Sequence, residues 1–263
     1  MYYKLFLPYQ FGLEGEYPIY SKEQIEEAKK SPDFPREYEG AYLGMIGNTF
    51  SEAAIQACQK LGEELDSRPI RPDTQKAIGI DSAFGGGSNF AITTIEYLAD
   101  INKFRVIQSD EYHRPHLNDM LDLIWNLKKN FGNISNIFAD ASAPVVWQGL
   151  KHMLGEKWSE IYMKMAMDNC KKYNILPETR MTVVPVAFST NHKQLLQNCK
   201  FVTEYVDQDG RSLIGIHPRH TKLITSLRTA ISTEYSLDKT QTSFNDVLDS
   251  YRLAVSYIKR RDR

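Results

Sequence analysis

The sequence predicts an α/β protein built around a mixed β-sheet with helices on both faces. Short apolar runs rich in β-branched and aromatic residues alternate with segments whose apolar residues recur at helical spacing. From residue 77 onward, three strands joined by tight turns are followed by strands that alternate with helices, which is typical of a mixed sheet. A chain of 263 residues that is 42% hydrophobic and 25% charged can bury a full core.

The first 70 residues are rich in Tyr, Pro and Glu and are predicted to be a linker segment with two helices. Ser21 is expected to cap the first helix. Ser51 is expected to cap the second, over 51–65. The predicted organisation is therefore an N-terminal segment, 1–70, followed by a single α/β domain, 71–263.

The second segment is predicted to contain strands and helices in regular succession. The expected strands are 77–82, 90–97, 104–109, 136–141, 182–186 and 211–216. The expected helices are 116–131, 145–153, 158–173, 193–204, 221–232 and 245–259. The last strand is expected to form a hairpin with 201–206 or its neighbour. This order is the RNase H-like (RuvC-like) arrangement, a mixed β-sheet flanked by helices on both faces.

The glycine run 85–87 raises the question of a phosphate-binding loop. A dinucleotide-binding loop opens a helix, whereas the residues that follow this run have the pattern of a strand. A hairpin turn between the first two strands is therefore the preferred interpretation.

Aspartates stand at the ends of two predicted strands and on the last helix. Asp81 and Asp140 each follow a run of apolar residues, and Asp246 and Asp249 lie three apart, hence on one helical face. In a mixed sheet the ends of the first and fourth strands can be neighbours, and the last helix can cross that end. Crowded carboxylates repel one another, so we expect two Mg²⁺ or Mn²⁺ ions between them.

Each of these acids also has an ordinary interpretation. A single aspartate after a strand is usually a turn or cap residue, and Asp249 alone could be a solvated helix residue. Asp81 and Asp140, however, both end apolar strands instead of lying on open surface. Taken as a set, the acids favour a metal site.

A local basic stretch is the candidate contact for DNA phosphates. It consists of His217, Arg219, His220, Lys222 and Arg228. Such side chains make phosphate contacts and salt-sensitive binding, although a solvated helix edge would look the same in sequence. Because the net charge is -1, any DNA-binding surface must be a local patch.

Three motifs resemble the nuclease domain of phage and viral terminase large subunits. Residues 78–81 with the glycine-rich turn resemble the first catalytic strand of that family, 138–142 its second acidic strand, and 244–254 its acidic C-terminal helix. Further similarity covers 20–25 and 31–38, which resemble the segment that leaves the packaging ATPase, and 47–50, which resembles its junction with the nuclease. Residues 183–188 and 191–196 resemble the family's fifth strand and the helix that follows it. One departure is Asn245, which stands where the family usually has an acid.

The resemblance implies a two-metal endodeoxyribonuclease that cuts concatemeric viral DNA during genome packaging. It assigns Asp81, Asp140 and Asp246 as ligands of two divalent ions, with Asp249 as a fourth. It also implies that the chain acts on double-stranded DNA, assembles with a portal protein and a small terminase subunit, and works in the cytoplasm of the infected host cell. No G-x-x-x-x-G-K-[ST] motif occurs, so no nucleotide site is expected in this chain. No apolar run approaches the ~18–20 residues of a membrane span.

Two other functions remain open from the sequence. A Holliday-junction resolvase-like nuclease shares the fold and the paired acids of the last helix. A DNA-binding or assembly module that has lost catalysis is the second, and Asn245 is its only support.

Overall fold

The computed structural model divides the chain into two compact units, Met1–Ile46 and Gly47–Arg263. The structure describes residue 13 and residues 18–29, 48–82, 89–113, 115–146, 148–149, 182–232 and 236–258. In the first unit, helix α1 (Lys22–Ala28) begins at the predicted cap. The Gln24 amide donates to the Ser21 hydroxyl at 3.1 Å, and the Ser21 amide donates to the Gln24 side chain at 2.8 Å.

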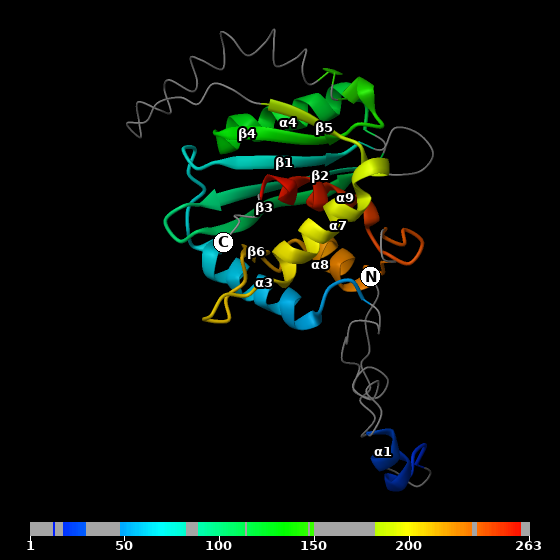
Figure 1. Cartoon of the computed structure of the whole chain (residues 1–263). Helices are drawn as coiled ribbons and strands as arrows, with labels where there is room; N and C mark the ends of the chain where they lie inside the picture. The colour runs from blue at the N-terminus through cyan, green and yellow to red at the C-terminus, as the bar shows by residue number, and fades with distance from the viewer. Residues whose placement is uncertain are drawn as a thin grey trace. The chain divides into compact units, whose positions relative to one another are not determined.

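A mixed sheet forms the centre of the second unit. Its strands are β1 (Lys76–Asp81), β2 (Phe90–Leu98), β3 (Lys103–Tyr112), β4 (Ile134–Asp140), β5 (Thr182–Val186) and β6 (Ile214–Gly215). Their order across the sheet is β5-β4-β1-β2-β3-β6 (Figure 1). β1, β2 and β3 are antiparallel neighbours, while β4 is parallel to β1, β5 to β4 and β6 to β3. This is the RNase H-like topology that the sequence predicts.

Helices cover both faces of the sheet (Figure 1). They are α3 (Glu52–Asp66), α4 (Leu117–Phe131), α7 (Phe188–Glu204), α8 (Thr221–Thr229) and α9 (Asn245–Ala254), which continues into the short 3₁₀ helix η2 (Val255–Tyr257). α4 packs in one hydrophobic core, and α3, α7, α8 and α9 pack in the other. Within the described ranges, no helix combines the length and the apolar character that crossing a bilayer requires.

Strand alternation decides which side chains face which helical layer. Ile80 of β1 packs in the core that contains α4, whereas Ala77 packs in the core that contains α9. Asp81 therefore points to the α9 side. In β4, Phe138 packs on the same side, and Asp140 follows it by two residues. Both strand-end aspartates thus lie on the face that α9 covers.

Helix α9 lies directly against β1 at Gly79. A Cβ atom on Gly79 would be 2.0 Å from the Ser250 carbonyl oxygen and 2.3 Å from the Ala254 amide nitrogen, so no larger residue fits. Ser250 also contacts the next strand, because its hydroxyl oxygen is 2.8 Å from that of Thr93. This contact places the first turns of α9 beside the end of β1.

Helix α7 begins earlier than the sequence predicts. It starts at Phe188, whereas the apolar pattern indicated residue 193. Its N-cap residue, Ala187, makes no side-chain cap hydrogen bond, so the sequence carries no signal at the true start. The glycine run and the two helices expected at 145–153 and 158–173 lie wholly or mostly outside the described residues.

The strand expected at 211–216 is shorter than predicted, and its hairpin with 201–206 is reduced to one antiparallel bridge between Val206 and Ser212. Only Ile214–Gly215 joins the sheet, where it pairs in parallel with β3. The reason lies in α3, because the Ile216 amide donates to the carbonyl oxygen of Cys58 at 2.8 Å. A backbone group bonded to a helix is not available to a longer ladder.

Helix α3 belongs to the second unit, whereas the predicted boundary at residue 70 falls after it. Ile55 and Cys58 of α3 pack in the same core as α9. The apolar face of this helix is therefore buried within the α/β unit. The resemblance of the N-terminal segment to the end of a packaging ATPase stays a prediction.

We predict that Gly79→Ala lowers the free energy of unfolding by about 1–3 kcal/mol, because the added methyl group overlaps the backbone of α9. Urea denaturation measures this difference. Gly149→Ala is the matched control, since its Cβ atom would meet Leu121 at an ordinary 3.8 Å. If Gly79→Ala unfolds at the same urea concentration as the wild type, the close approach of α9 to β1 is wrong.

Candidate functional site

The two strand-end aspartates lie next to each other at the carboxyl ends of β1 and β4. The parallel register pairs Ile80 with Ala139, and the next residues along the two strands are Asp81 and Asp140. Neighbouring strands are about 4.8 Å apart, and both side chains face the α9 layer. The predicted juxtaposition of these acids is therefore present in the sheet.

Helix α9 brings two more acids to the same place. Asp246 is 9% exposed and Asp249 only 1%, and charged side chains are rarely this buried without partners. Burial raises the pKa of Asp81 well above its usual value, and the charges of Asp249, Asp246 and Asp140 raise it further. All four predicted carboxylates are thus close enough to act on one another.

Lys239 meets these carboxylates and was missed by the sequence analysis. Its Nζ atom is 2.7 Å from Asp249 Oδ2. Burial lowers the pKa of Lys239, but the charges of Asp249, Asp81 and Asp246 outweigh burial and raise it overall. Lys239 lies in a turn before α9, where neither helical nor strand periodicity marks a residue. Asn245 steadies this turn, since its amide donates to the Lys239 carbonyl oxygen at 3.1 Å.

The other carboxylates differ in their hydrogen bonds. The Ser142 amide donates to Asp140 Oδ1 at 3.0 Å, and the Ser142 hydroxyl donates to Oδ2. The Asn89 amide donates to Asp246 Oδ2 at 2.8 Å. Burial raises the pKa of Asp246, and this hydrogen bond partly opposes the rise. Among the described residues, nothing donates a hydrogen bond to the Asp81 carboxylate.

The donor set suits hard divalent cations, because Mg²⁺ and Mn²⁺ prefer oxygen ligands. Over the described part of the chain, no three His, Cys, Asp or Glu side chains are arranged to hold a metal ion as they stand. The hydrogen bonds give a reason, since Asp140 is turned to Ser142 and Asp249 to Lys239. Metal binding therefore requires rotation of side chains. The mutual repulsion at Asp81 and the ammonium group that offsets it both fit a cation at this position.

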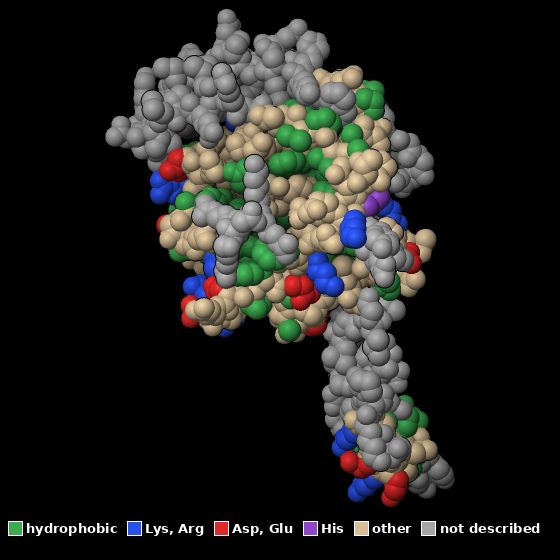
Figure 2. Space-filling view, viewed as in Figure 1, with side chains coloured by type: hydrophobic (Ala, Val, Ile, Leu, Met, Phe, Trp, Pro, Cys, Tyr) green, Lys and Arg blue, Asp and Glu red, His purple; other side chains and the backbone are tan. Residues whose placement is uncertain are grey.

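Two of the predicted DNA contacts are instead bound to helix α3. Arg219 forms an ion pair with Asp66, and Arg228 forms one with Glu52 at 2.6 Å. On the face shown in Figure 2, Lys and Arg side chains are scattered and several lie beside acids. The basic stretch in the sequence does not become one free basic surface.

The two histidines of that stretch also face inward or toward α3. His220 is 8% exposed, and its ring nitrogen Nε2 lies 3.3 Å from the Val106 carbonyl oxygen. His217 lies 3.8 Å from Asp66. A buried His220 is a core residue and is not available to a phosphate group.

Lys222 is the predicted DNA contact that connects to the acidic site. Its Nζ atom is 3.5 Å from Glu111 Oε1 and 6.0 Å from the ring centroid of Phe244. The charge of Glu111 in turn raises the pKa of Asp246. Lys222 is therefore the member of the basic set that lies at the rim of the carboxylate cluster.

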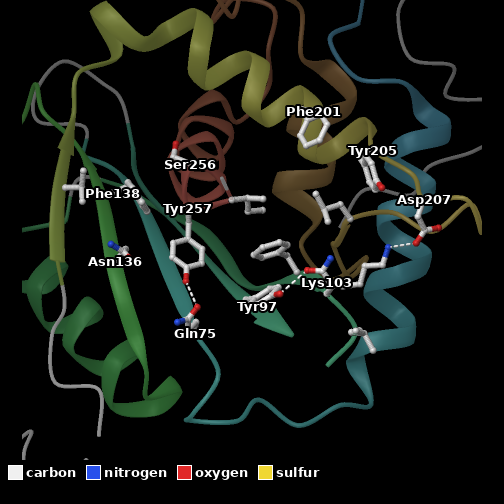
Figure 3. Close-up of a pocket in the computed structure, with 16 residues that line it drawn as sticks. Gln75, Tyr97, Lys103, Asn136, Phe138, Phe201, Tyr205, Asp207, Ser256 and Tyr257 are labelled. Carbon is white, nitrogen blue, oxygen red and sulfur yellow. Dashed lines mark hydrogen bonds and ion pairs between the residues drawn. The ribbon is translucent and has the colours of Figure 1, made fainter. Parts of the chain in front are cut away.

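A large cavity lies at the other end of the sheet (Figure 3). Its volume is about 900 Å³, and Gln75 and Asn136, from the starts of β1 and β4, line it. Polar groups in it pair with one another, as Tyr257 does with Gln75 at 2.7 Å and Lys103 with Asp207 at 2.6 Å. We therefore place the functional site at the aspartates and not in this cavity.

No protein-family model matches the sequence, and no curated protein matches it significantly. Among solved structures, the chain is similar to nuclease domains of large terminases, as the sequence predicts. The large terminase nuclease of thermophilic phage G20c is 16% identical over 71% of this chain and 83% of that chain, with a TM-score of 0.44. The g2p nuclease domain of bacteriophage SPP1 with bound Mn is 16% identical over 74% and 92%, with a TM-score of 0.45. The gp2 nuclease domain of bacterial virus Sf6 is 12% identical over 79% and 98%, with a TM-score of 0.46. At these low identities the similarity is one of fold only. The strand order of the sheet establishes that fold independently of the comparison.

We predict that Asp81→Asn stabilises the metal-free protein at neutral pH by about 1–3 kcal/mol, because it removes a buried charge to which no described residue donates a hydrogen bond. The folded wild type holds the Asp81 proton more tightly than the unfolded chain does. Wild-type stability in EDTA should therefore fall as pH rises above about 4, and the variant should depend less on pH. Thermal unfolding in EDTA measures both effects. Asp209→Asn, in an exposed turn, is the control, and a variant less stable than wild type would contradict the repulsion.

Burial of His220 should make stability depend on pH in the opposite direction from burial of Asp81. Burial lowers the pKa of His220 to about 4, so the unfolded chain binds a proton more tightly than the folded protein. Stability should therefore be lost as pH falls from about 6.5 to 4, by up to about 3 kcal/mol. Urea denaturation across this range should show a smaller loss for His220→Gln than for wild type. His113→Gln, at an exposed position, should leave the slope unchanged, and an unchanged slope in both variants would refute the prediction.

Proposed function

We propose that this chain is a metal-dependent DNA endonuclease that cuts concatemeric viral DNA during genome packaging. The observation that carries the proposal is the convergence of Asp81, Asp140, Asp246 and Asp249 from two strand ends and one helix. A buried cluster of carboxylates that raise one another's pKa values is unusual in a purely structural role. The resemblance of the three motifs to terminase large subunits supports the choice of substrate.

Asp81, Asp140 and Asp246 are the metal ligands in this proposal. Two bound Mg²⁺ or Mn²⁺ ions would supply an activated water and neutralise charge on the scissile phosphate. The chain's own residues set the positions of the carboxylates. β1 and β4 hold Asp81 and Asp140 at adjacent strand ends, and the Asn89 amide orients one oxygen of Asp246. Asp249, predicted as a fourth ligand, has both oxygens bonded to cations.

Double-stranded DNA is the proposed substrate, and Lys222 at the rim of the cluster is the proposed phosphate contact. The motif resemblance supports assembly with a portal protein and a small terminase subunit. It also supports action in the cytoplasm of the infected host cell.

The test is cleavage of supercoiled plasmid by the full chain with Mg²⁺, Mn²⁺ or EDTA. We expect cutting with a divalent ion only, and a decrease of at least about 100-fold in Asp140→Asn and Asp246→Asn, because each removes a ligand. Asp209→Asn, which removes a charge elsewhere, should cut at the wild-type rate.

Other outcomes discriminate the alternatives. Preferred cutting of a four-way junction over linear duplex would replace the proposal with a resolvase-like function. Binding of DNA without cleavage by either metal would indicate an inactive assembly module. Full activity of Asp140→Asn would show that the ligand assignment is wrong.

A further inference from the structure

Phe244 has a backbone conformation that a phenylalanine rarely adopts. It is the residue before α9, and its φ of 51° and ψ of 44° lie in the left-handed region. Among the described residues, the other non-glycine residue with a positive φ is Asn102, whose short polar side chain tolerates this region. A bulky aromatic side chain does not, so the backbone at Phe244 is strained.

Three hydrogen bonds hold Phe244 in this conformation. Its carbonyl oxygen accepts from the Ser226 hydroxyl of α8 at 3.1 Å. It also accepts from the amides of Val247 and Leu248, in the first turn of α9, at 3.1 and 3.2 Å. The surrounding structure therefore maintains the strain and fixes the backbone from which the ring projects. Strain that is maintained in this way is concentrated at functional sites.

Burial does not explain the position of the ring. Phe244 is 39% exposed, and within the described ranges it is the one aromatic residue among the exposed large apolar side chains. A single exposed apolar residue is ordinary by itself. An exposed ring that also strains its own backbone is not, because packing in the folded chain does little to offset the strain.

A cation lies beside this ring at the edge of the carboxylate cluster. The Nζ atom of Lys222 is 6.0 Å from the ring centroid of Phe244 and 3.5 Å from Glu111 Oε1. The Glu111 side chain is only 11% exposed, whereas that of Lys222 is 39% exposed. The ammonium group is thus held from the protein side and open to solvent. Asp246 of the cluster follows Phe244 by two residues.

The sheet register gives the distance from this edge to the strand-end acids. Glu111 of β3 is opposite Ala91 of β2, and Ala91 is opposite Asp81 of β1. Residues directly opposite in antiparallel strands point to the same face, so Glu111 and Asp81 share the α9 face, about 10 Å apart. That distance corresponds to about three nucleotides of a DNA strand. A strand with its phosphate at the acids therefore reaches Lys222 and Phe244.

A ring beside a cation matches the two parts of a nucleotide that proteins contact most. The ammonium group of Lys222 suits a phosphate. An exposed aromatic ring suits a nucleobase, because every base has a face on which a ring can stack. Apolar side chains, phenylalanine among them, also insert between the base steps of a duplex and unstack them locally.

We propose that Phe244 is a DNA-contacting residue that stacks on a nucleobase close to the phosphate bound by Lys222. This inference rests on the proposed function and adds a base contact to it. The ligand is a base of a strand that is locally unstacked beside the carboxylate cluster. Phe244 contacts no metal ion and takes part in no bond-making step. The strained backbone has a role in this proposal, because it presents the ring beside Lys222.

The test is binding of a short fluorescein-labelled duplex to the full chain, measured by fluorescence anisotropy with Ca²⁺ in place of Mn²⁺. Phe244→Asn removes the ring and suits the left-handed backbone, so it should lower DNA affinity by about 10-fold. Phe244→Tyr keeps the ring and should bind like the wild type. Val206→Asn is the matched control, because Val206 is 48% exposed and lies beside Asp207 at the other end of the sheet. Wild-type affinity in Phe244→Asn overturns the inference.

Salt dependence separates stacking from an indirect effect on Lys222. Lys222→Met removes a phosphate contact, so the slope of log affinity against log salt concentration should become shallower by about one. Phe244→Asn removes no charge, so its affinity should fall at every salt concentration with an unchanged slope. If Phe244→Asn flattens the slope as Lys222→Met does, the ring only holds the ammonium group in place, and the base contact is wrong.

Thermal unfolding should change in the direction opposite to DNA affinity. Because asparagine tolerates the left-handed region, Phe244→Asn should unfold about 2–4 °C above the wild type while it binds DNA more weakly. A lower unfolding temperature with wild-type DNA affinity would identify the ring as a packing residue and overturn the inference. If Phe244→Asn does not fold, Phe244→Leu and Phe244→Tyr carry the comparison, since both keep the strain. Leucine should then bind DNA more weakly than tyrosine, and equal affinities contradict stacking.

Failure of this inference can be distinguished from failure of the proposed function. A wild-type chain that binds no DNA, or that cuts none with Mg²⁺ or Mn²⁺, refutes the proposed function. Metal-dependent cutting by the wild type, with unchanged DNA affinity in Phe244→Asn, refutes only the base contact.

Discussion

The close approach of α9 to β1 at Gly79 is the constraint on which the functional end of the molecule depends. Without a side chain on Gly79, the Ser250 carbonyl group and the Ala254 amide can lie against the strand. The hydrogen bond between Ser250 and Thr93 then sets the position of the helix across β2. Asp246 lies one turn before Ser250 and Asp249 lies directly before it, so both acids come to lie beside the end of β1. The chemistry of the site follows from backbone packing at a single glycine.

The two ends of β1 show how differently the fold treats buried charge. At its start, Lys76 and Glu96 are both fully buried, and Glu96 also bonds to Arg105 at 2.6 Å. Burial lowers the pKa of Lys76 to about 8, but its charge lies beside Glu96 and its Nζ atom donates to backbone carbonyl groups. At the other end, Asp81 faces three aspartates and the ammonium group of Lys239, and no described residue donates a hydrogen bond to it. A balanced network is typical of structure, whereas an unbalanced one is typical of a functional site and is relieved by a bound cation or by protonation.

The DNA-binding residues were the least predictable part of the site. Arg219 and Arg228 look like free cations in sequence because their partners, Asp66 and Glu52, lie more than one hundred residues earlier in the chain. Lys239 is the opposite case, a functional cation that looks ordinary in sequence. Nothing in its local sequence shows that the charges of Asp249, Asp81 and Asp246 act on it. Ion pairing depends on contacts across the fold, which periodicity along the chain does not record.

The sequence by itself determined the sheet and the acids at its carboxyl edge. Strand alternation and apolar runs depend only on near neighbours, so they predict β1, β4 and the carboxyl ends where Asp81 and Asp140 stand. The three-residue spacing on α9 likewise places Asp246 and Asp249 on one face. Only the tertiary structure decided how these acids are held, because Lys239, which pairs with Asp249, lies in a turn with no pattern of its own. Charged side chains meet their partners only when distant parts of the chain fold together, so these ion pairs depend on the tertiary structure.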